Sequence, residues 1–267
     1  MAGLLQIVGG GRMGEALIGG LLAAGWAKPD EIVVVERLAS RGAELEERFP
    51  GVRVVDSVVR SDGAVVAVKP GDVAGVCAEL SAAGVTRVLS IAAGVTTAAI
   101  ERACGDRDPA VRVVRAMPNT PALVGAGASA IAGGTAADDD DLVWAESILA
   151  AVGVVVRVSE GALDAVTGLS GSGPAYVFLV AESLIDAGVL AGLTRDVSTT
   201  LAVQTLLGAA RLLSETGDDA AALKAAVTSP GGTTAAGLRA LEDRAVRAAF
   251  LDAVSAATER SRELGAG

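Results

Sequence analysis

The 267-residue sequence predicts an α/β protein, with an open doubly wound sheet in its first part and an all-helical second part. Up to about residue 160, short β-branched runs alternate with helical patterns, and beyond Glu160 the strand signal disappears. Because hydrophobic residues make up 51% of the chain and aromatic ones only 2%, the interior must consist mainly of Ala, Val and Leu. We therefore expect domains at 1–160 and 161–267.

Eight segments of the first part are predicted strands. They are nearly all apolar and do not alternate, which is typical of parallel strands covered on both faces. Helical stretches between them are predicted over 12–24, 39–48 and 139–151, and this alternation indicates a doubly wound sheet. The predicted strands are 4–8, 32–36, 52–55, 64–68, 88–91, 111–115, 129–132 and 154–158.

The second part is predicted to form helices over 174–187, 197–214, 219–227, from Thr233 or Thr234 onward, and over 246–264. Pro174 suits a first-turn position, and Thr194 or Asp196 and the pair Asp218-Asp219 are candidate caps. No charge occurs from Val197 to Ala210, so this helix should be buried on every side. Two interpretations remain, a central helix of a monomeric bundle or a subunit interface, and the small size of the bundle favours the interface.

Several classes of site are excluded by composition. The chain has no His, so it cannot form a Ser-His-Asp relay or an HExxH zinc site. Two cysteines cannot build a four-ligand zinc cage or an iron–sulfur cluster within one chain. The net charge of −10 argues against nucleic acid as the main partner. The run Asp138–Asp141 is interpreted as a solvated helix start rather than a metal site.

A cytoplasmic location is expected. Residues 4–8 have no basic segment before them and no cleavage site after them, so they are interpreted as a strand rather than a signal peptide. The uncharged windows 116–137 and 165–181 contain Gly and Pro in their middle, which argues against membrane spans and a membrane partner. Cys77 and Cys104 are interpreted as small core side chains.

A glycine-rich turn follows the first predicted strand. Gly9, Gly11 and Gly14 satisfy G-x-G-x-x-G, with a strand before the motif and a helix after it. The first glycine permits the tight turn, the second lets the backbone approach a pyrophosphate, and the third allows close helix–strand packing. Free N–H groups at the helix start suit an anion. The first domain is therefore predicted to be a dinucleotide-binding, Rossmann-type domain.

The form of the dinucleotide is left open by the next loop. Glu36, at the end of the second strand, could accept hydrogen bonds from a ribose 2′-OH and would favour NAD. Arg37, with Ser40 and Arg41 nearby, could instead bind the 2′-phosphate of NADP. Arg37 and Arg41 could also simply begin a solvated helix.

Further clusters lie at strand ends and between helices. Ala67–Pro70 and Arg115–Pro121 follow strands, at the sheet edge where doubly wound folds bind ligands. Ser170–Tyr176 leads into the second domain, and Val227–Thr234 joins two helices. In this last segment Gly231 and Gly232 can adopt backbone angles that aim successive N–H groups at one small carboxylate. A tight turn with threonine capping is the structural alternative.

Together these segments resemble the pyrroline-5-carboxylate reductase family over nearly the whole chain. The resemblance rests on the glycine turn, Ala67–Pro70, Ser90–Gly94, Met117–Pro121, Ser170–Tyr176 and Ser229–Thr234, in the family's order. It implies reduction of a cyclic imine acid to L-proline with NADP as cofactor, or NAD in its place. It also implies a homodimer formed through the helical domain, and in some members these dimers assemble further, into a pentamer of dimers.

The resemblance also assigns roles to single positions. A substrate-carboxylate loop corresponds to Ser229, Gly231, Gly232, Thr233 and Thr234, with Thr234 near the ring nitrogen and thus the candidate catalytic residue. Where many members carry Asp-Asn after the third strand, this chain has Asp56-Ser57, which changes the expected adenine-side pocket. The expected cofactor residues are Gly9, Gly11, Arg12, Met13, Gly14, Glu36, Arg37, Ser57, Val68, Lys69, Pro70, Ala92, Ala93, Gly94, Met117, Pro118 and Asn119.

Such a reaction needs no His. A cyclic imine is easily protonated in water, and its iminium carbon accepts hydride, so the protein has to bind, orient and exclude water. Lys69 is interpreted as lining the cofactor rather than as a nucleophile.

Two alternative functions share this predicted architecture. The first is a related imine or 3-hydroxy-acid oxidoreductase, but hydroxy-acid members carry a lysine early in the second domain and here none occurs between Lys69 and Lys224. The second is a non-catalytic dinucleotide sensor, for which no effector segment is evident.

Overall fold

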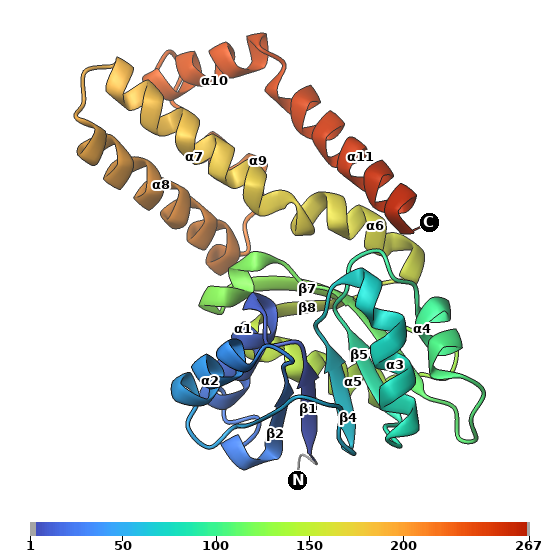
Figure 1. Ribbon diagram of the computed structural model, residues 1–267. Helices are drawn as coiled ribbons and strands as arrows, with labels where there is room; N and C mark the ends of the chain where they lie inside the picture. The colour runs from blue at the N-terminus through green and yellow to red at the C-terminus, as the bar shows by residue number, and fades with distance from the viewer. Residues whose placement is uncertain (1–3, 266–267) are drawn as a thin grey trace. The chain divides into compact units, whose positions relative to one another are not determined.

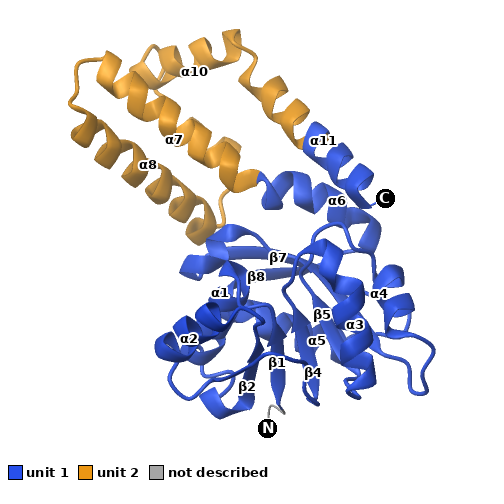
Figure 2. Ribbon diagram, viewed as in Figure 1, with its two compact units in different colours: residues 1–172, 256–267 blue, residues 173–255 orange. Residues whose placement is uncertain are grey.

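The computed structural model describes residues 4–265 and divides into two compact units. Unit 1 comprises Met1–Ser172 and Ala256–Gly267, and unit 2 comprises Gly173–Ser255 (Figure 2). The last helix, α11 (Val246–Gly265), runs through the boundary between the units.

Unit 1 contains an eight-stranded sheet, in the order β3-β2-β1-β4-β5-β6-β7-β8 (Figure 1). All eight predicted strands are confirmed, and all neighbours pair in parallel except β6 and β7, which are antiparallel. The reversal follows from the short connection after β6, since a parallel pair needs a crossover of a dozen or more residues. The strands are β1 (Leu5–Val8), β2 (Ile32–Val35), β3 (Arg53–Val55), β4 (Gly63–Val66), β5 (Arg87–Ser90), β6 (Arg112–Met117), β7 (Gly127–Gly133) and β8 (Gly153–Arg157).

Helices cover both faces of this sheet, as a doubly wound fold requires. One face packs against α1 (Arg12–Ala23), α2 (Ala39–Arg48) and α5 (Asp139–Leu149). The other packs against α3 (Val73–Ala82) and α4 (Thr97–Cys104). Cys77 and Cys104 lie buried in this second layer, which confirms their interpretation as core side chains.

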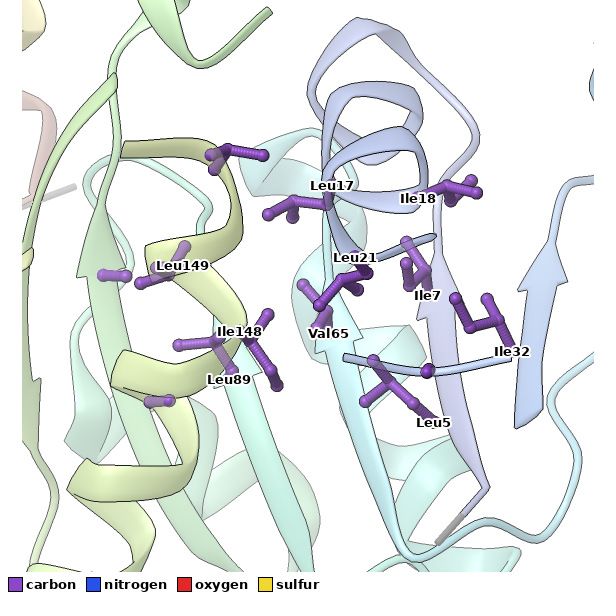
Figure 3. Close-up of a cluster of buried hydrophobic side chains, with 14 of the residues drawn as sticks. Leu5, Ile7, Leu17, Ile18, Leu21, Ile32, Val65, Leu89, Ile148 and Leu149 are labelled. Carbon is purple, nitrogen blue, oxygen red and sulfur yellow. The ribbon is translucent and has the colours of Figure 1, made fainter. Parts of the chain in front are cut away.

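The larger core lies between the sheet and the α1/α5 side. Ile7, Leu17 and Ile148 are fully buried there, and Figure 3 shows α1 and α5 pointing such side chains toward β1, β4 and β5. Each fully buried aliphatic side chain contributes about 1.5–3 kcal/mol of transfer free energy. Unit 1 therefore has a continuous hydrophobic core of its own.

The Asp138–Asp141 run departs from the solvated start that was expected. Asp138 does cap α5, accepting a hydrogen bond from Asp141 N at 3.1 Å. Asp141, however, is fully buried and pairs with Arg87 at 2.6 Å and Arg112 at 3.5 Å. The local pattern could not show this, because both arginines come from neighbouring strands of the sheet. Within residues 4–265, no group of three or more potential ligand side chains is gathered for a metal.

The sequence predicts that Gly168 and Pro174 interrupt the helical backbone. This prediction is wrong. α6 (Leu163–Val166) continues through a π-helical turn at Thr167–Gly171 into α7 (Gly173–Leu190). Pro174 has no N–H to donate back into this stretch, and the Ser170 carbonyl four residues before it accepts instead from Asn119 Nδ2 at 3.0 Å. By length and composition alone, the stretch Glu160–Leu190 is apolar enough to cross a membrane.

Unit 2 holds helices α7, α8 (Arg195–Thr216), α9 (Ala220–Ala226), α10 (Thr233–Asp243) and the first part of α11. Thr194 caps α8 by accepting from Val197 N at 3.4 Å, and Asp219 caps α9 by accepting from Ala222 N at 2.7 Å. The N-cap of α10 is Gly232, without a side-chain hydrogen bond, so neither Thr233 nor Thr234 caps that helix.

Unit 2 buries almost nothing by itself. Among its residues 173–255, only Ser198 and Ala202 are buried. In the uncharged segment of α8, Leu201 and Leu207 remain 54% and 52% exposed. The central helix of a monomeric bundle is therefore excluded, and the apolar surface of α8 is left for a partner to cover.

Candidate functional site

The strand order reverses at β1, which lies between β2 and β4. In open α/β sheets this switch point is where ligands bind, at the carboxyl ends of the strands. The predicted cofactor residues of unit 1 follow β1, β2, β3, β4, β5 and β6 directly, and these six strands run in the same direction. The fold thus gathers the predicted cofactor residues along one edge.

The glycine turn has the geometry that its sequence predicts. Gly9 has φ +107°, and a Cβ there would lie 2.6 Å from the Ala67 carbonyl oxygen. A Cβ on Gly14 would lie 2.1 Å from the Gly9 carbonyl, so both positions require glycine. A Cβ on Gly11 would meet nothing within 4 Å. The fold itself therefore does not require glycine at this position, and the open space beside it is where a pyrophosphate is expected to approach.

The residues after Gly11 begin helix α1. Arg12 is the first residue of the helix and is exposed, while Met13 is half-buried and packs against the large core. The exposed first turn leaves backbone N–H groups directed at the turn.

Glu36 closes the glycine turn from the end of β2. Its Oε2 accepts a hydrogen bond from Gly10 N at 3.0 Å, and its Oε1 accepts from Leu38 N at 2.9 Å. The carboxylate is thereby fixed at the edge of the turn.

The arginines of this loop are paired with carboxylates. Arg41 donates to the Gly10 carbonyl at 2.8 Å and forms ion pairs with Glu15 and with Glu44. The hydrogen bonds that Arg41 donates to Glu44 and Glu15 raise the pKa of Arg41. Arg37 forms an ion pair with Glu79 of α3 at 2.8 Å.

Ser57 follows β3 at the adjacent strand end. Its hydroxyl donates to Asp56 Oδ1 at 3.0 Å, and both residues are exposed. The adenine-side edge therefore carries a second carboxylate beside that of Glu36.

Two loops line a cavity of about 800 Å³ in unit 1. One comes after β4, where Val68 packs on the core, Lys69 is exposed and Pro70 lines the cavity. The other comes after β5, where Ala92 is buried and Ala93 and Gly94 line the cavity. Its remaining wall includes Thr96, Arg102, Thr167, Arg260, Ser261 and Leu264. The sequence analysis missed these residues, because those from α11 come from the far end of the chain and carry no local motif.

The segment after β6 is tied to the π-helical turn. Asn119 is buried; its Oδ1 accepts from Ala128 N at 2.8 Å and its Nδ2 donates to the Ser170 carbonyl at 3.0 Å. A Cβ on Gly171 would lie 2.6 Å from Met117 Cε, so these segments touch. Pro118, which lies between Met117 and Asn119 in the sequence, is also buried. The conformation of Met117–Asn119 therefore depends on the Thr167–Gly171 turn.

An ion pair between buried Arg115 and half-buried Glu160 lies at the start of the same helical stretch. Glu160 accepts from Thr97 N and Thr97 Oγ1, both at 2.7 Å, and from Arg115 at 3.2 Å. Burial alone would raise the pKa of Glu160, but the hydrogen bonds from Thr97 and Arg115 outweigh it and lower that pKa. Sequence reasoning missed this pair, since its members are far apart along the chain.

In unit 2, the predicted carboxylate loop lies between α9 and α10. Gly231 has φ +68°, and Gly232 N donates to the Ser229 carbonyl at 3.0 Å. A Cβ on Gly232 would lie 2.3 Å from Ser229 Oγ, so any other residue there would displace the Ser229 hydroxyl. Thr233 and Thr234 occupy the first turn of α10, where helical N–H groups lack intrahelical partners. This loop offers hydroxyls and amide N–H groups together, a donor set suited to a small carboxylate.

Two family models match the chain. "Pyrroline-5-carboxylate reductase dimerisation" matches residues 160–264, and "NADP oxidoreductase coenzyme F420-dependent" matches residues 4–94. The first covers the α6–α11 region, and the second covers the glycine turn and the loops after β2, β3, β4 and β5.

Relatives match over the full length. A pyrroline-5-carboxylate reductase of Synechocystis is 46% identical over 267 residues, covering 98% of each chain. The structure of such a reductase from Coxiella burnetii aligns with TM-score 0.92 and 39% identity, covering 99% of each chain. That of Plasmodium falciparum pyrroline carboxylate reductase, with NADP bound, aligns with TM-score 0.84 and 31% identity, covering 98% of each chain.

The glycine turn, the loops at the strand ends and the full-length similarity all indicate the same family. The chain belongs to the pyrroline-5-carboxylate reductase family and is an NAD(P)-dependent oxidoreductase acting on a carbon–nitrogen double bond.

Proposed function

We propose that this protein reduces 1-pyrroline-5-carboxylate to L-proline, the final step of proline biosynthesis, with a reduced nicotinamide dinucleotide. The observation that carries the proposal is full-length similarity to named reductases, including the segment Ser229–Thr234 that the resemblance assigns to the substrate carboxylate.

The dinucleotide is proposed to bind at the strand-end edge of unit 1. The open space beside Gly11 fits a pyrophosphate, because a side chain there would occupy the approach. Lys69, Pro70 and the Ala92–Gly94 loop would line the nicotinamide half, with Met117–Asn119 beyond them. When bound, the reduced nicotinamide supplies the hydride.

The substrate carboxylate is proposed to bind the Ser229–Thr234 loop of unit 2. Ser229 and Thr233 are exposed and Thr234 is half-buried, so hydroxyls and first-turn N–H groups are available to an anion. Thr234 would hydrogen-bond the ring nitrogen and orient the imine carbon.

In this mechanism no side chain performs obligatory general acid catalysis. The imine nitrogen is protonated before reduction, and hydride addition to the iminium carbon leaves an amine that carries that proton. The protein contributes orientation, which can lower the barrier by roughly 7–11 kcal/mol when two reactants are held in near-attack geometry.

The proposal includes the assembly and the location. Residues 1–160 form the dinucleotide domain, and residues 161–267 form the substrate-binding domain that makes a cytoplasmic homodimer. A second copy, rather than lipid, would cover the exposed apolar residues of α7 and α8, and a pentamer of dimers is the larger assembly proposed. The family match of residues 160–264 to a dimerisation model supports the dimer.

The test is Thr234→Ala, assayed with pyrroline-5-carboxylate by loss of nicotinamide absorbance. We expect kcat to fall about 10- to 100-fold, as for one lost hydrogen bond of about 1.4–3 kcal/mol, with an unchanged Kd for the reduced cofactor. Thr234→Ser should restore most of the activity.

Thr228→Ala is the matched control. The Thr228 hydroxyl donates to the Lys224 carbonyl at 2.6 Å, so its loss affects only the end of α9. Full activity of Thr234→Ala would remove Thr234 from the mechanism, and absence of turnover in the parent protein would overturn the proposed reaction.

A further inference from the structure

An acidic side chain, Glu36, follows β2 and is held by backbone N–H groups. The basic side chains nearby, Arg37 and Arg41, are paired with other carboxylates. From this arrangement we propose that the protein prefers NADH to NADPH, with Glu36 as the residue that sets the preference. The inference rests on the proposed function, since it concerns the cofactor of that same reaction.

Glu36 is oriented by the protein backbone. The bonds from Gly10 N at 3.0 Å and Leu38 N at 2.9 Å use one acceptor position on each carboxylate oxygen. A carboxylate offers about four such positions, so two remain for hydroxyl donors. The side chain is half-buried between the glycine turn and the solvent edge, and its packing does not need the remaining positions.

The position of Glu36 in the fold determines which part of the dinucleotide its two remaining acceptor positions would face. It follows the last residue of β2, beside the glycine turn, and an acidic residue at this point of a doubly wound fold faces the ribose of the adenosine half. Two ribose hydroxyls can donate to the carboxylate. A 2′-phosphate would instead bring a charge of about −1.5 to −2 against it.

The arginines nearby are already paired. Arg41 is bound to the Gly10 carbonyl, Glu15 and Glu44, and Arg37 is bound to Glu79. Each guanidinium keeps N–H groups beyond these bonds, so a 2′-phosphate that binds either arginine would have to share it with a carboxylate of the same charge. An ordinary ribose brings no such competition.

The surrounding charge has the same sign as Glu36. Arg37 pairs with Glu79, Arg41 and Arg48 pair with Glu15, and Arg41 also pairs with Glu44, so three guanidinium groups are matched by three carboxylates and Glu36 adds a fourth. Asp56, with the Ser57 hydroxyl bonded to it, adds a further carboxylate at the end of the adjacent strand. The adenosine edge is thus acidic overall, which departs from NADP as the expected first choice.

The experiment compares kcat/KM for NADH and NADPH, and Kd for each by nicotinamide fluorescence. The parent protein should favour NADH by at least 10-fold. In Glu36→Ser, which removes the carboxylate and leaves a hydroxyl, the NADPH/NADH ratio should rise at least 10-fold.

Glu79→Gln provides a second, independent variant. It frees Arg37 from its ion pair and leaves Glu36 and the glycine turn unchanged, so NADPH use should rise several-fold while NADH use stays unchanged. Glu47→Gln removes one charge from the exposed face of α2 and is the matched control, with no expected change in the ratio.

A parent protein that favours NADPH, or a ratio that Glu36→Ser leaves unmoved, overturns the assignment. If neither cofactor is oxidised in the presence of pyrroline-5-carboxylate, the proposed reaction is wrong. The ratio of the two dissociation constants still tests Glu36 in that case, so the two failures are distinguishable.

Discussion

The two units of this chain use the same small aliphatic residues with opposite results. In unit 1, Val and Leu side chains lie in two layers on either side of the sheet, and its longest strands are almost wholly buried. In unit 2, helices rich in Ala, Val and Leu leave Leu201, Leu207 and Phe178 more than half exposed. Unit 1 is therefore complete as a single copy, whereas unit 2 is complete only when another surface covers it.

This difference bears on the two proposed binding regions. The proposed dinucleotide edge consists of loops at strand ends that rest on the core of unit 1. The proposed carboxylate loop lies among the exposed helices of unit 2. Both tryptophans, Trp26 and Trp144, lie in unit 1 and pack on its core, so their fluorescence reports that unit alone.

The largest effect is expected from a charge placed on the apolar surface of α8. Leu207→Arg should abolish the proposed dimer and the activity, because an unpaired charge buried in an interface costs about 3–5 kcal/mol. Light scattering should then give the monomer mass, while tryptophan fluorescence and NADH binding stay near the parent values. Leu207→Met is the control. A dimeric, active Leu207→Arg protein would show that this surface of α8 is not the interface.

The next effect separates folding from cofactor binding within unit 1. Gly11→Ala adds a methyl where nothing lies within 4 Å and φ is −67°, so the melting temperature should not fall. The methyl would meet the pyrophosphate, and Kd for NADH should rise at least 10-fold, or about 1.4 kcal/mol. Gly75→Ala, also in open space but on α3, should leave Kd unchanged. Equal NADH binding in both variants would place the pyrophosphate elsewhere.

A smaller effect on NADH binding, with a larger one on stability, is expected at the tether between the strand-end loops and the π-helical turn. Asn119→Leu keeps the approximate size but leaves Ala128 N and the Ser170 carbonyl without their partner. Two unsatisfied groups cost about 1–3 kcal/mol each, and kcat should fall more than NADH affinity. Asn119→Asp retains the acceptor for Ala128 N but places a buried carboxylate oxygen beside the Ser170 carbonyl, so it should also lower the stability to urea. Unchanged stability in both variants would mean that the tether contributes nothing.

The smallest effect is pH-dependent and local to unit 1. Because the folded state lowers the pKa of Glu160, the carboxylate stabilises the fold above its unfolded pKa, near 4.5, and this contribution is lost as pH falls through the folded value. Glu160→Gln should therefore cost about 1–2 kcal/mol at pH 7 and progressively less below pH 4. Urea unfolding, monitored by tryptophan fluorescence, measures this cost at pH 7 and below pH 4. A cost that is the same at both pH values would exclude the ion pair as its source.

Most of the fold was predictable because its signals are local. Apolar runs without alternation marked all eight strands, and Thr194 and Asp219 marked two helix starts. The antiparallel β7 was not predicted, because strand direction depends on connection length rather than composition. The π-helical turn at Thr167–Gly171 was missed because its glycines and Pro174 carry the same signal as a loop.

The candidate site was predictable where a single backbone segment forms it, as at Gly9, Gly14 and Gly232. A Cβ at any of these positions would lie within 2.6 Å of a backbone or hydroxyl atom. The site was not predictable where a side chain's partner is distant in sequence. Asp141 was expected in solvent yet is buried against Arg87, and the Glu36–Arg37–Arg41 conflict required knowing that Glu79 lies within reach of Arg37.

The uncovered aliphatic surface of α8 makes protein concentration a thermodynamic variable for this enzyme. If two copies must meet before the helices are shielded, the midpoint of thermal unfolding rises with the amount of protein in solution. Newly synthesised chains would be most prone to nonspecific association before they form the proposed dimer. A cell that makes very little of this protein would then obtain less activity per molecule than one that makes it in abundance.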